Sequence, residues 1–145
     1  MPQYLRDRAS STEGSKLYGG RYNTKGAFGA LYCGERPGVC SAELRKATAG
    51  RTLAPFVLAS LRVKLQRVLD LTDRTVLRRL GVWSKDLVSP DWTLTQDLGR
   101  LAREAGFEAL LVPSAAAPGR NLVIFPDHLD PASSVQLRAV KPVRI

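Results

Sequence analysis

The sequence has few of the residues that metal sites and histidine-based catalysis require. It contains one histidine, His128, and two cysteines, Cys33 and Cys40. Two cysteines and one histidine give no metal-binding spacing. A catalytic triad would have to use His128, which lies in the loop-like segment FPDHLDP. We therefore expect no metal site, and we expect both cysteines to be small buried or half-buried thiols in a reducing compartment.

Long apolar runs are also absent. No run approaches the roughly 18 residues of a membrane-spanning helix. The opening MPQYLRDRASSTEGSK lacks the apolar core of an export signal. We expect a cytoplasmic protein that does not enter a membrane. A length of 145 residues predicts a single domain over 1–145, with 1–16 as a flexible or loop-like N-terminal arm.

Acidic residues are outnumbered. The chain has 22 Lys and Arg against 13 Asp and Glu, a net charge of +9. The excess is spread along the chain, at +4 in residues 1–50, +4 in 51–100 and +1 in the remainder. This charge predicts an anionic partner such as a nucleotide, a nucleic acid or an acidic protein surface. Arg74, Arg78 and Arg79 form only a modest basic face, so direct binding of nucleic acid is the weaker interpretation.

Apolar periodicity and turn residues predict interleaved strands and helices. The fold class that we predict is α+β, with a mixed or antiparallel central sheet and flanking helices. Trp83 and Trp92 are assigned to packing. The expected strands are 28–33, 55–65, 67–71, 107–114, 121–126 and 135–145, and the expected helices are 39–50, 73–82 and 94–106.

A glycine-rich stretch, LYGGRYNTKGAFGALYCG at 17–34, places five glycines around Arg21, Asn23 and Lys25. It is not a P-loop, because Lys25 precedes its glycine and Ala27 follows. It is not a dinucleotide fingerprint either, because it leads into a strand. An arginine fork suits a pyrophosphate. A solvated β-turn is the alternative.

Three segments in order, GGRYNTKG, ALYCGERPGVCSAEL and LLVPSAAAPGRNLVIFPDH, resemble the RES domain family between Gly19 and His128. The resemblance implies an ADP-ribosyltransferase-like fold and a toxin of a bacterial toxin–antitoxin pair. It implies cleavage of the nicotinamide–ribose bond of NAD by hydrolysis or phosphorolysis, with NAD as substrate and no cofactor. The implied partner is a cognate antitoxin with an Xre-type helix-turn-helix, in a hetero-oligomeric complex. Two alternatives are an ADP-ribosyltransferase acting on a protein and a nucleic-acid-binding or RNA-cleaving toxin.

The resemblance also implies three catalytic residues. Glu43 would contact the nicotinamide ribose and stabilise its developing positive charge, Tyr32 would stack near the nicotinamide, and Ser114 would hydrogen-bond the amide or ribose. Such chemistry needs neither metal nor histidine, because nicotinamide is already a cationic leaving group. The ordinary alternatives are a solvated Glu43 paired with Lys46, a core tyrosine and a turn-starting serine.

The remaining implied site residues bind NAD. Arg21 would hold the pyrophosphate or an acidic ribose edge, and Asn121 would keep the Ser114 loop in shape. Members of the family also carry an arginine upstream of the glycine loop, for which Arg6 and Arg8 are the candidates here. The full set of implied NAD-binding residues is Arg21, Tyr22, Asn23, Lys25 and Asn121.

Overall fold

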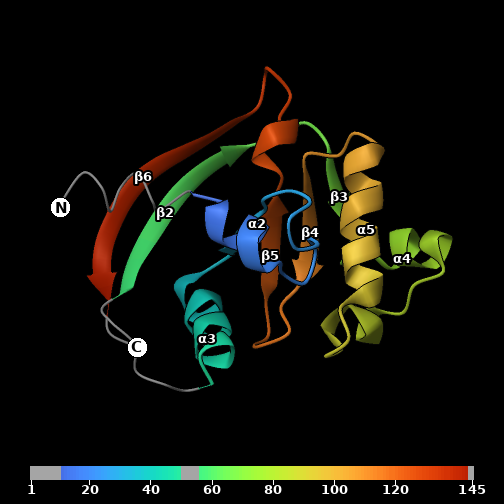
Figure 1. Ribbon diagram of the computed structural model, residues 1–145, viewed down its shortest axis with the longest axis horizontal. Coiled ribbons are helices and arrows are strands. Elements are labelled where there is room, and N and C mark those ends of the chain that lie inside the picture. The colour runs from blue at the N-terminus through green and yellow to red at the C-terminus, as the bar shows by residue number, and fades with distance from the viewer. Residues whose placement is uncertain (1–10, 50–55, 144–145) are drawn as a thin grey trace.

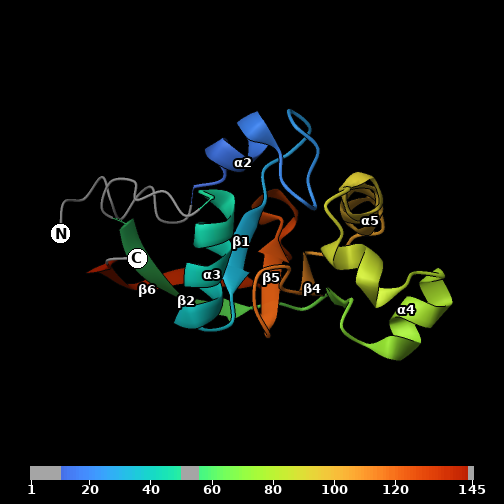
Figure 2. The same ribbon diagram turned by 90° about the horizontal axis from the view of Figure 1, so that it is seen from below.

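The fold centres on a four-stranded mixed sheet in a computed structural model that describes residues 11–49 and 56–143. The strand order is β1 (Leu31–Gly34), β5 (Arg120–Ile124), β4 (Ala109–Pro113) and β3 (Val68–Asp70). Figure 1 shows β5, β4 and β3, and Figure 2 shows β1 beside β5. β5 is antiparallel to both of its neighbours, whereas β3 and β4 are parallel. The predicted α+β class with a mixed sheet is confirmed.

A long two-stranded ribbon forms the second sheet. β2 (Phe56–Lys64) pairs antiparallel with β6 (Ser134–Val143), and the register shifts between Ser60 and Leu61. In Figure 1 the ribbon arcs away on the side opposite α4 and α5. Only its end near the four-stranded sheet contributes to the core, through Leu61, Val63 and Val135.

Within residues 11–49 and 56–143, four helices and two short 3₁₀ turns surround the sheets. In Figure 2, α2 and α5 lie toward the top of the view relative to β4 and β5, and α4 lies at the far right. The helices are α2 (Glu13–Tyr18), α3 (Pro37–Ala47), α4 (Arg74–Leu80) and α5 (Thr93–Glu104), and the 3₁₀ turns are η1 (Ser84–Val88) and η2 (Pro126–His128).

Alternating side chains divide the core into two clusters. Along β4, Leu110 and Val112 belong to the cluster on the α5 side, whereas Ala109 belongs to the cluster beneath the β2–β6 ribbon. Leu31 and Ile124, which are paired across β1 and β5, also face the ribbon. The sheet is therefore covered on both faces, and its two faces present different side chains to their surroundings.

Several sequence expectations require correction. The loop expected through residue 16 is in part a helix, since α2 begins at Glu13, while 1–10 lies outside the described residues. The first strand starts at Leu31 rather than at residue 28. The α3 helix ends at Ala47, and the glycine at position 50 expected to stop it lies outside the described residues.

The two tryptophans are also not packed as expected, because Trp83 is 72% and Trp92 40% exposed. Within 11–49 and 56–143, no helix is long and apolar enough to cross a bilayer.

Candidate active site

The glycine-rich loop rests directly on helix α5. Gly20 and Asn23 exchange two backbone hydrogen bonds of 2.9 and 3.3 Å, and Gln96 Nε2 donates to the Gly20 carbonyl at 3.0 Å. At Gly99, a Cβ atom would lie 1.9 Å from the carbonyl oxygen of Tyr22. Only glycine allows this approach, so α5 sets the position of the loop.

Asn23 acts as an internal brace of this loop. Its side chain is fully buried, and Nδ2 donates to the carbonyls of Ser15 at 2.8 Å and Phe28 at 3.1 Å. Its Oδ1 accepts from the Tyr32 hydroxyl at 2.5 Å. Every polar atom of the amide thus has a protein partner, and the structure places Asn23 where it shapes the loop without facing a ligand.

Two tyrosines meet behind the loop. The Tyr32 hydroxyl accepts from the backbone N–H of Tyr22 at 3.0 Å, while the Tyr32 residue remains 40% exposed. Burial of its hydroxyl raises the pKa of Tyr32 to about 12, although the backbone N–H of Tyr22, the positive charge of Arg21 and the backbone of Asn23 oppose that rise. Tyr32 therefore stays protonated at neutral pH and presents a neutral aromatic ring. Tyr22 is 1% exposed and packs in the core.

Arg21 joins the loop to the segment before α5. Its guanidinium donates to the carbonyls of Leu87 and Ser89 and lies 5.6 Å from the ring centroid of Trp92. This anchoring fixes the arginine at the edge of the site, where part of its surface remains accessible. Lys25, at the tip of the same loop, is exposed.

A carboxylate held by a serine and an amide forms the centre of the site. Glu43 Oε1 accepts from Ser114 Oγ at 2.5 Å and from Asn121 Nδ2 at 3.0 Å. Ser114 Oγ in turn accepts from the backbone N–H groups of Ala116 and Ala117 at 3.1 and 3.3 Å. Because those groups occupy the serine lone pairs, its one proton is directed at Glu43.

Glu43 does not pair with Lys46, which was the ordinary alternative for its role. Lys46 Nζ donates to the carbonyl of Ala115 at 2.8 Å, so the lysine secures the Ser114 loop instead of pairing with the glutamate. Helix α3 and the β4–β5 turn are thereby tied at two points, Lys46–Ala115 and Glu43–Ser114.

Hydrogen bonds bring Glu43, Ser114 and Asn121 together, and Tyr32 lies on the same face of the sheet as Asn121. In the β1–β5 register Tyr32 lies opposite Val123 and Gly34 opposite Asn121, so Tyr32 and Asn121 are near neighbours on the same face. Burial raises the pKa of Tyr22. The positive charge of Arg21 lowers this pKa and the negative charge of Glu43 raises it, so Arg21 and Glu43 both lie close enough to act on the Tyr22 hydroxyl. Arg6 and Arg8 lie outside the described residues.

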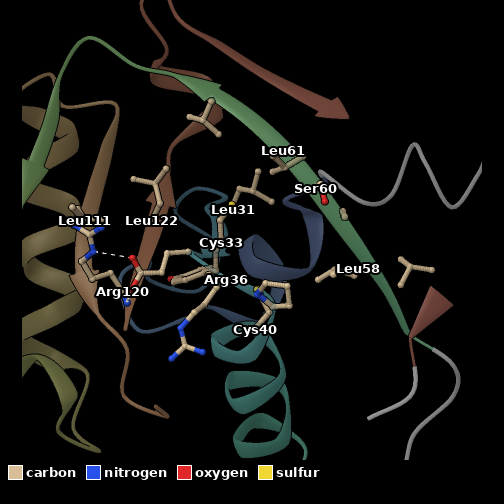
Figure 3. Close-up of a pocket in the computed structure, with 17 residues that line it drawn as sticks. Leu31, Cys33, Arg36, Cys40, Leu58, Ser60, Leu61, Leu111, Arg120 and Leu122 are labelled. Atoms are coloured by element: carbon tan, nitrogen blue, oxygen red, sulfur yellow. Dashed lines mark hydrogen bonds and ion pairs between the residues drawn. The ribbon is translucent and has the colours of Figure 1, made fainter. Parts of the chain in front are cut away.

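The opposite face of the sheet holds a separate cavity of about 590 Å³ between β1 and β2 (Figure 3). Cys33 and Cys40 both line it, and the Glu35–Arg120 ion pair, with 3.0 Å between Oε2 and Nε, stands at its rim. Burial raises the pKa of Cys33 to about 11, so its thiol stays protonated. Of the predicted site residues, only Tyr32 reaches this cavity.

Reasoning from the sequence missed the residues that support the loop. Ser15 Oγ donates to the carbonyl of Ala30 at 2.8 Å and accepts from its N–H at 2.9 Å, which ties α2 to the start of β1. Gln96 and Gly99 hold the loop from the other side. A glycine inside the otherwise regular helical pattern of α5 was the one available signal of a close backbone approach.

The fold and the site together define a class: an α+β domain with a carboxylate held by a serine and an amide beside an exposed tyrosine. The model of the RES domain matches residues 2–144, and the chain belongs to the RES domain family. Membership agrees with the order of the three sequence segments that converge here.

Relatives in mycobacteria carry names that describe an activity. The chain is 39% identical over 111 residues to the probable NAD(+) phosphorylase Rv3189 of Mycobacterium tuberculosis, which covers 73% of this chain and 53% of that protein. It is 30% identical over 137 residues to the NAD(+) phosphorylase MbcT of Mycobacterium bovis, covering 90% and 73%. The chain thus spans about half the length of the first relative.

A solved structure has the same fold. The crystal structure of the M. tuberculosis MbcT–MbcA toxin–antitoxin complex superposes with a TM-score of 0.80 at 29% identity, covering 92% of this chain and 76% of that chain. The likeness extends over nearly all of the described residues.

Proposed function

We propose that the chain cleaves NAD at the bond between nicotinamide and ribose, with inorganic phosphate as the acceptor, as a toxin of a toxin–antitoxin pair. The observation that carries this proposal is the Glu43 carboxylate, held on one oxygen by Ser114 and Asn121 beside the exposed ring of Tyr32. The names of the mycobacterial relatives support the choice of substrate and acceptor.

Glu43 stabilises positive charge in this mechanism. As the C1′–N bond breaks, its electron pair leaves with nicotinamide, whose cationic ring becomes neutral, and the ribose acquires oxocarbenium character. Ser114 and Asn121 both bond Oε1, and among the described residues no donor engages Oε2. That second oxygen faces the developing charge in our proposal, and a phosphate oxygen then forms the new bond to C1′.

The remaining site residues bind and position. The Tyr32 ring provides a stacking surface for nicotinamide, and the exposed Lys25 and part-exposed Arg21 provide positive charge for the phosphates. Tyr22 and Asn23 are buried, so we assign them to shaping the loop and not to direct contact with NAD.

The test is release of nicotinamide from NAD by the purified protein, measured with and without phosphate. We expect release that depends on phosphate and a drop of about a hundredfold or more in kcat for Glu43→Gln. Glu104→Gln, which changes an exposed carboxylate on α5, is the matched control and should retain activity. Intact NAD after prolonged incubation of the wild-type protein with phosphate would refute the proposal.

We further propose that the reaction needs no cofactor and no metal ion, with NAD serving only as substrate. The support is chemical, since the leaving group is already cationic and needs no Lewis acid. Nicotinamide release should survive dialysis against a chelator. Loss of activity on chelation, restored by a divalent metal, would contradict this part of the proposal.

Two other activities stay open as alternatives. If the ribose is captured by a protein nucleophile, mass spectrometry of treated lysate proteins will find one species heavier by an ADP-ribose unit. If the target is RNA, a labelled transcript will be cut while NAD remains intact. The carboxylate-centred site favours the NAD reaction over the RNA reaction, because no general acid–base pair for RNA cleavage lies beside Glu43 among the described residues.

For its partner we propose a cognate antitoxin of the Xre-type helix-turn-helix kind, in a hetero-oligomeric complex formed in the cytoplasm, where NAD is available. The support is the likeness to the toxin chain of a toxin–antitoxin complex. Co-expression with the neighbouring reading frame, followed by size-exclusion chromatography, tests this. Elution of the chain alone would count against it.

A further inference from the structure

Next to Ser114, at the carboxyl end of β4, the structure has a second cavity of about 680 Å³. Its wall includes Pro113, the residue immediately before Ser114, and Leu71 and Thr72, which follow the parallel strand β3. The cavity and the Glu43 site therefore share one stretch of backbone at the same end of the sheet. In sheets with parallel strands this end is the usual place for a ligand.

The lining of this cavity combines an aromatic ring with unpaired positive charge. Trp83 is 72% exposed, which is unusual for so large an apolar side chain. Arg74 and Arg78 stand one turn apart on α4 and line the same space. Among the described residues neither arginine forms an ion pair or a side-chain hydrogen bond, so both guanidinium groups are available to a ligand.

These groups suit a nucleotide. An indole face stacks a base regardless of its sequence identity, and a guanidinium binds a phosphate through paired N–H donors. Thr72 and Ser84 also line the cavity. NAD has two nucleotide halves joined by a pyrophosphate. The Glu43 site, with Arg21 and Lys25, accounts for the nicotinamide half and its phosphate but not for the adenylate half.

We propose that this cavity is the subsite for the adenylate half of NAD, with adenine stacked on Trp83 and its phosphate bound by Arg78 and Arg74. The proposal rests on the proposed function. The dinucleotide then crosses Pro113 and Ser114 from the α4 side to reach Glu43. Trp83 is mostly exposed rather than packed in the core, and its exposed ring is then explained as the surface on which adenine stacks.

The experiment compares NAD turnover with inhibition by ADP, which lacks nicotinamide. Trp83→Ala and Arg78→Ala should each raise the KM for NAD and the inhibition constant of ADP together, by about tenfold, the size expected for one lost base stack. Their kcat should stay within about twofold of the wild type, since neither residue touches the reacting carbon. Arg79→Ala, an exposed arginine on the same helix outside the cavity, is the matched control and should change neither constant.

A KM for NAD within about twofold of the wild type in Trp83→Ala and Arg78→Ala would overturn the subsite and leave the cleavage reaction intact. If the wild-type protein releases no nicotinamide, the proposed function fails by itself. Calorimetric titration with ADP then decides the subsite alone: weaker binding by Trp83→Ala and Arg78→Ala than by Arg79→Ala supports it, and equal binding overturns it.

Discussion

At the scale of single residues, the account depends on how Glu43 is held. The hydroxyl of Ser114 is bonded on all sides, with two backbone N–H groups donating to it and its own proton given to Glu43. A serine in this arrangement orients a carboxylate and is not free to attack C1′, because two N–H donors occupy the lone pairs of its oxygen.

Replacing Ser114 by alanine tests this role. The substitution removes one of the two donors to Glu43 Oε1, so the carboxylate is less firmly oriented in the transition state. We expect kcat to fall by about 10- to 100-fold with a smaller change in KM. Ser134→Ala, on the remote β2–β6 ribbon, should behave as the wild type. A drop in kcat far beyond 100-fold, larger than that of Glu43→Gln, would contradict the orienting role.

Another carboxylate, that of the buried Glu108, has a structural role. Its Oε2 accepts from the N–H groups of Gln66 and Arg67 at 2.7 and 2.8 Å, and its Oε1 accepts from Asp130 N at 2.7 Å. Burial alone raises the pKa of Glu108, but the nearby Ser133 hydroxyl and these N–H groups outweigh it and lower the pKa from 4.5 to about 2. The charged form thus links the start of β4 to one end of the β2–β6 ribbon, where the chain leaves β2 and later enters β6.

This shift predicts how stability depends on pH. Because the folded-state pKa lies below the unfolded value of 4.5, the stabilisation is complete above that value and is lost as the pH falls toward 2. Urea unfolding should show a smaller acid-induced loss of stability for Glu108→Gln than for the wild type. At neutral pH the variant should be less stable by about 1–3 kcal/mol, since backbone donors lose their acceptor. Equal pH profiles for the two proteins would contradict this role.

At the scale of elements, the close contact between α5 and the glycine loop positions the site. A methyl group at residue 99 would overlap the carbonyl oxygen of Tyr22, whose neighbours Arg21 and Asn23 shape the loop. Gln96, one turn earlier on the helix, bonds the same loop at Gly20.

Gly99→Ala is therefore expected to destabilise the protein by about 1–3 kcal/mol, even though alanine favours helices. Its KM for NAD should rise, because the displaced loop carries Arg21. Gly14→Ala in α2 is the matched control: a Cβ there meets no atom within 4 Å, and the change should be neutral or slightly stabilising. Thermal unfolding of both variants measures the difference, and equal stability would refute the contact.

Elements with local signals could be predicted from the sequence. Helix α4 begins where Asp73 accepts from the N–H groups of Thr75 and Val76, and it ends at Gly81 with φ 69°. Both signals are read from neighbouring residues. Helix α2 could not be predicted, because it buries no residue of its own and is secured by contacts such as Ser15 with the distant Ala30.

The site likewise contains features that local sequence signals could not predict. Glu43 and Ser114 are separated by 71 positions, and no periodicity in the sequence brings them together. That both residues belong to one site was expected only from the resemblance to a family, and their hydrogen bond was not expected. The exposure of Trp83 was missed because large apolar residues are usually packed, and only the tertiary structure shows which of them are not.

At the scale of the whole molecule, the net charge of +9 is distributed over the fold and not gathered on one binding face. Basic residues occur on α4, on the β2–β6 ribbon and on the glycine loop. Such a distribution attracts anions in general but does not distinguish one anion from another. The choice of ligand therefore depends on the geometry of the binding site and not on the net charge.

Binding to RNA should therefore be weak and strongly dependent on salt. Fluorescence anisotropy with a labelled oligonucleotide is expected to show association at low ionic strength that disappears near physiological salt. Tight binding that persists at high salt would indicate a dedicated nucleic-acid surface and would favour the RNA-cleaving alternative.

The central claim is that Arg21, Tyr32, Glu43 and Ser114 form one site for NAD on the α5 side of the sheet. The most direct measurement is a crystal structure of Glu43→Gln with NAD bound. We predict the nicotinamide ribose beside residue 43 and the nicotinamide ring on Tyr32. Density for the dinucleotide in the cavity on the ribbon side of the sheet, next to Cys33 and Cys40, would contradict the account.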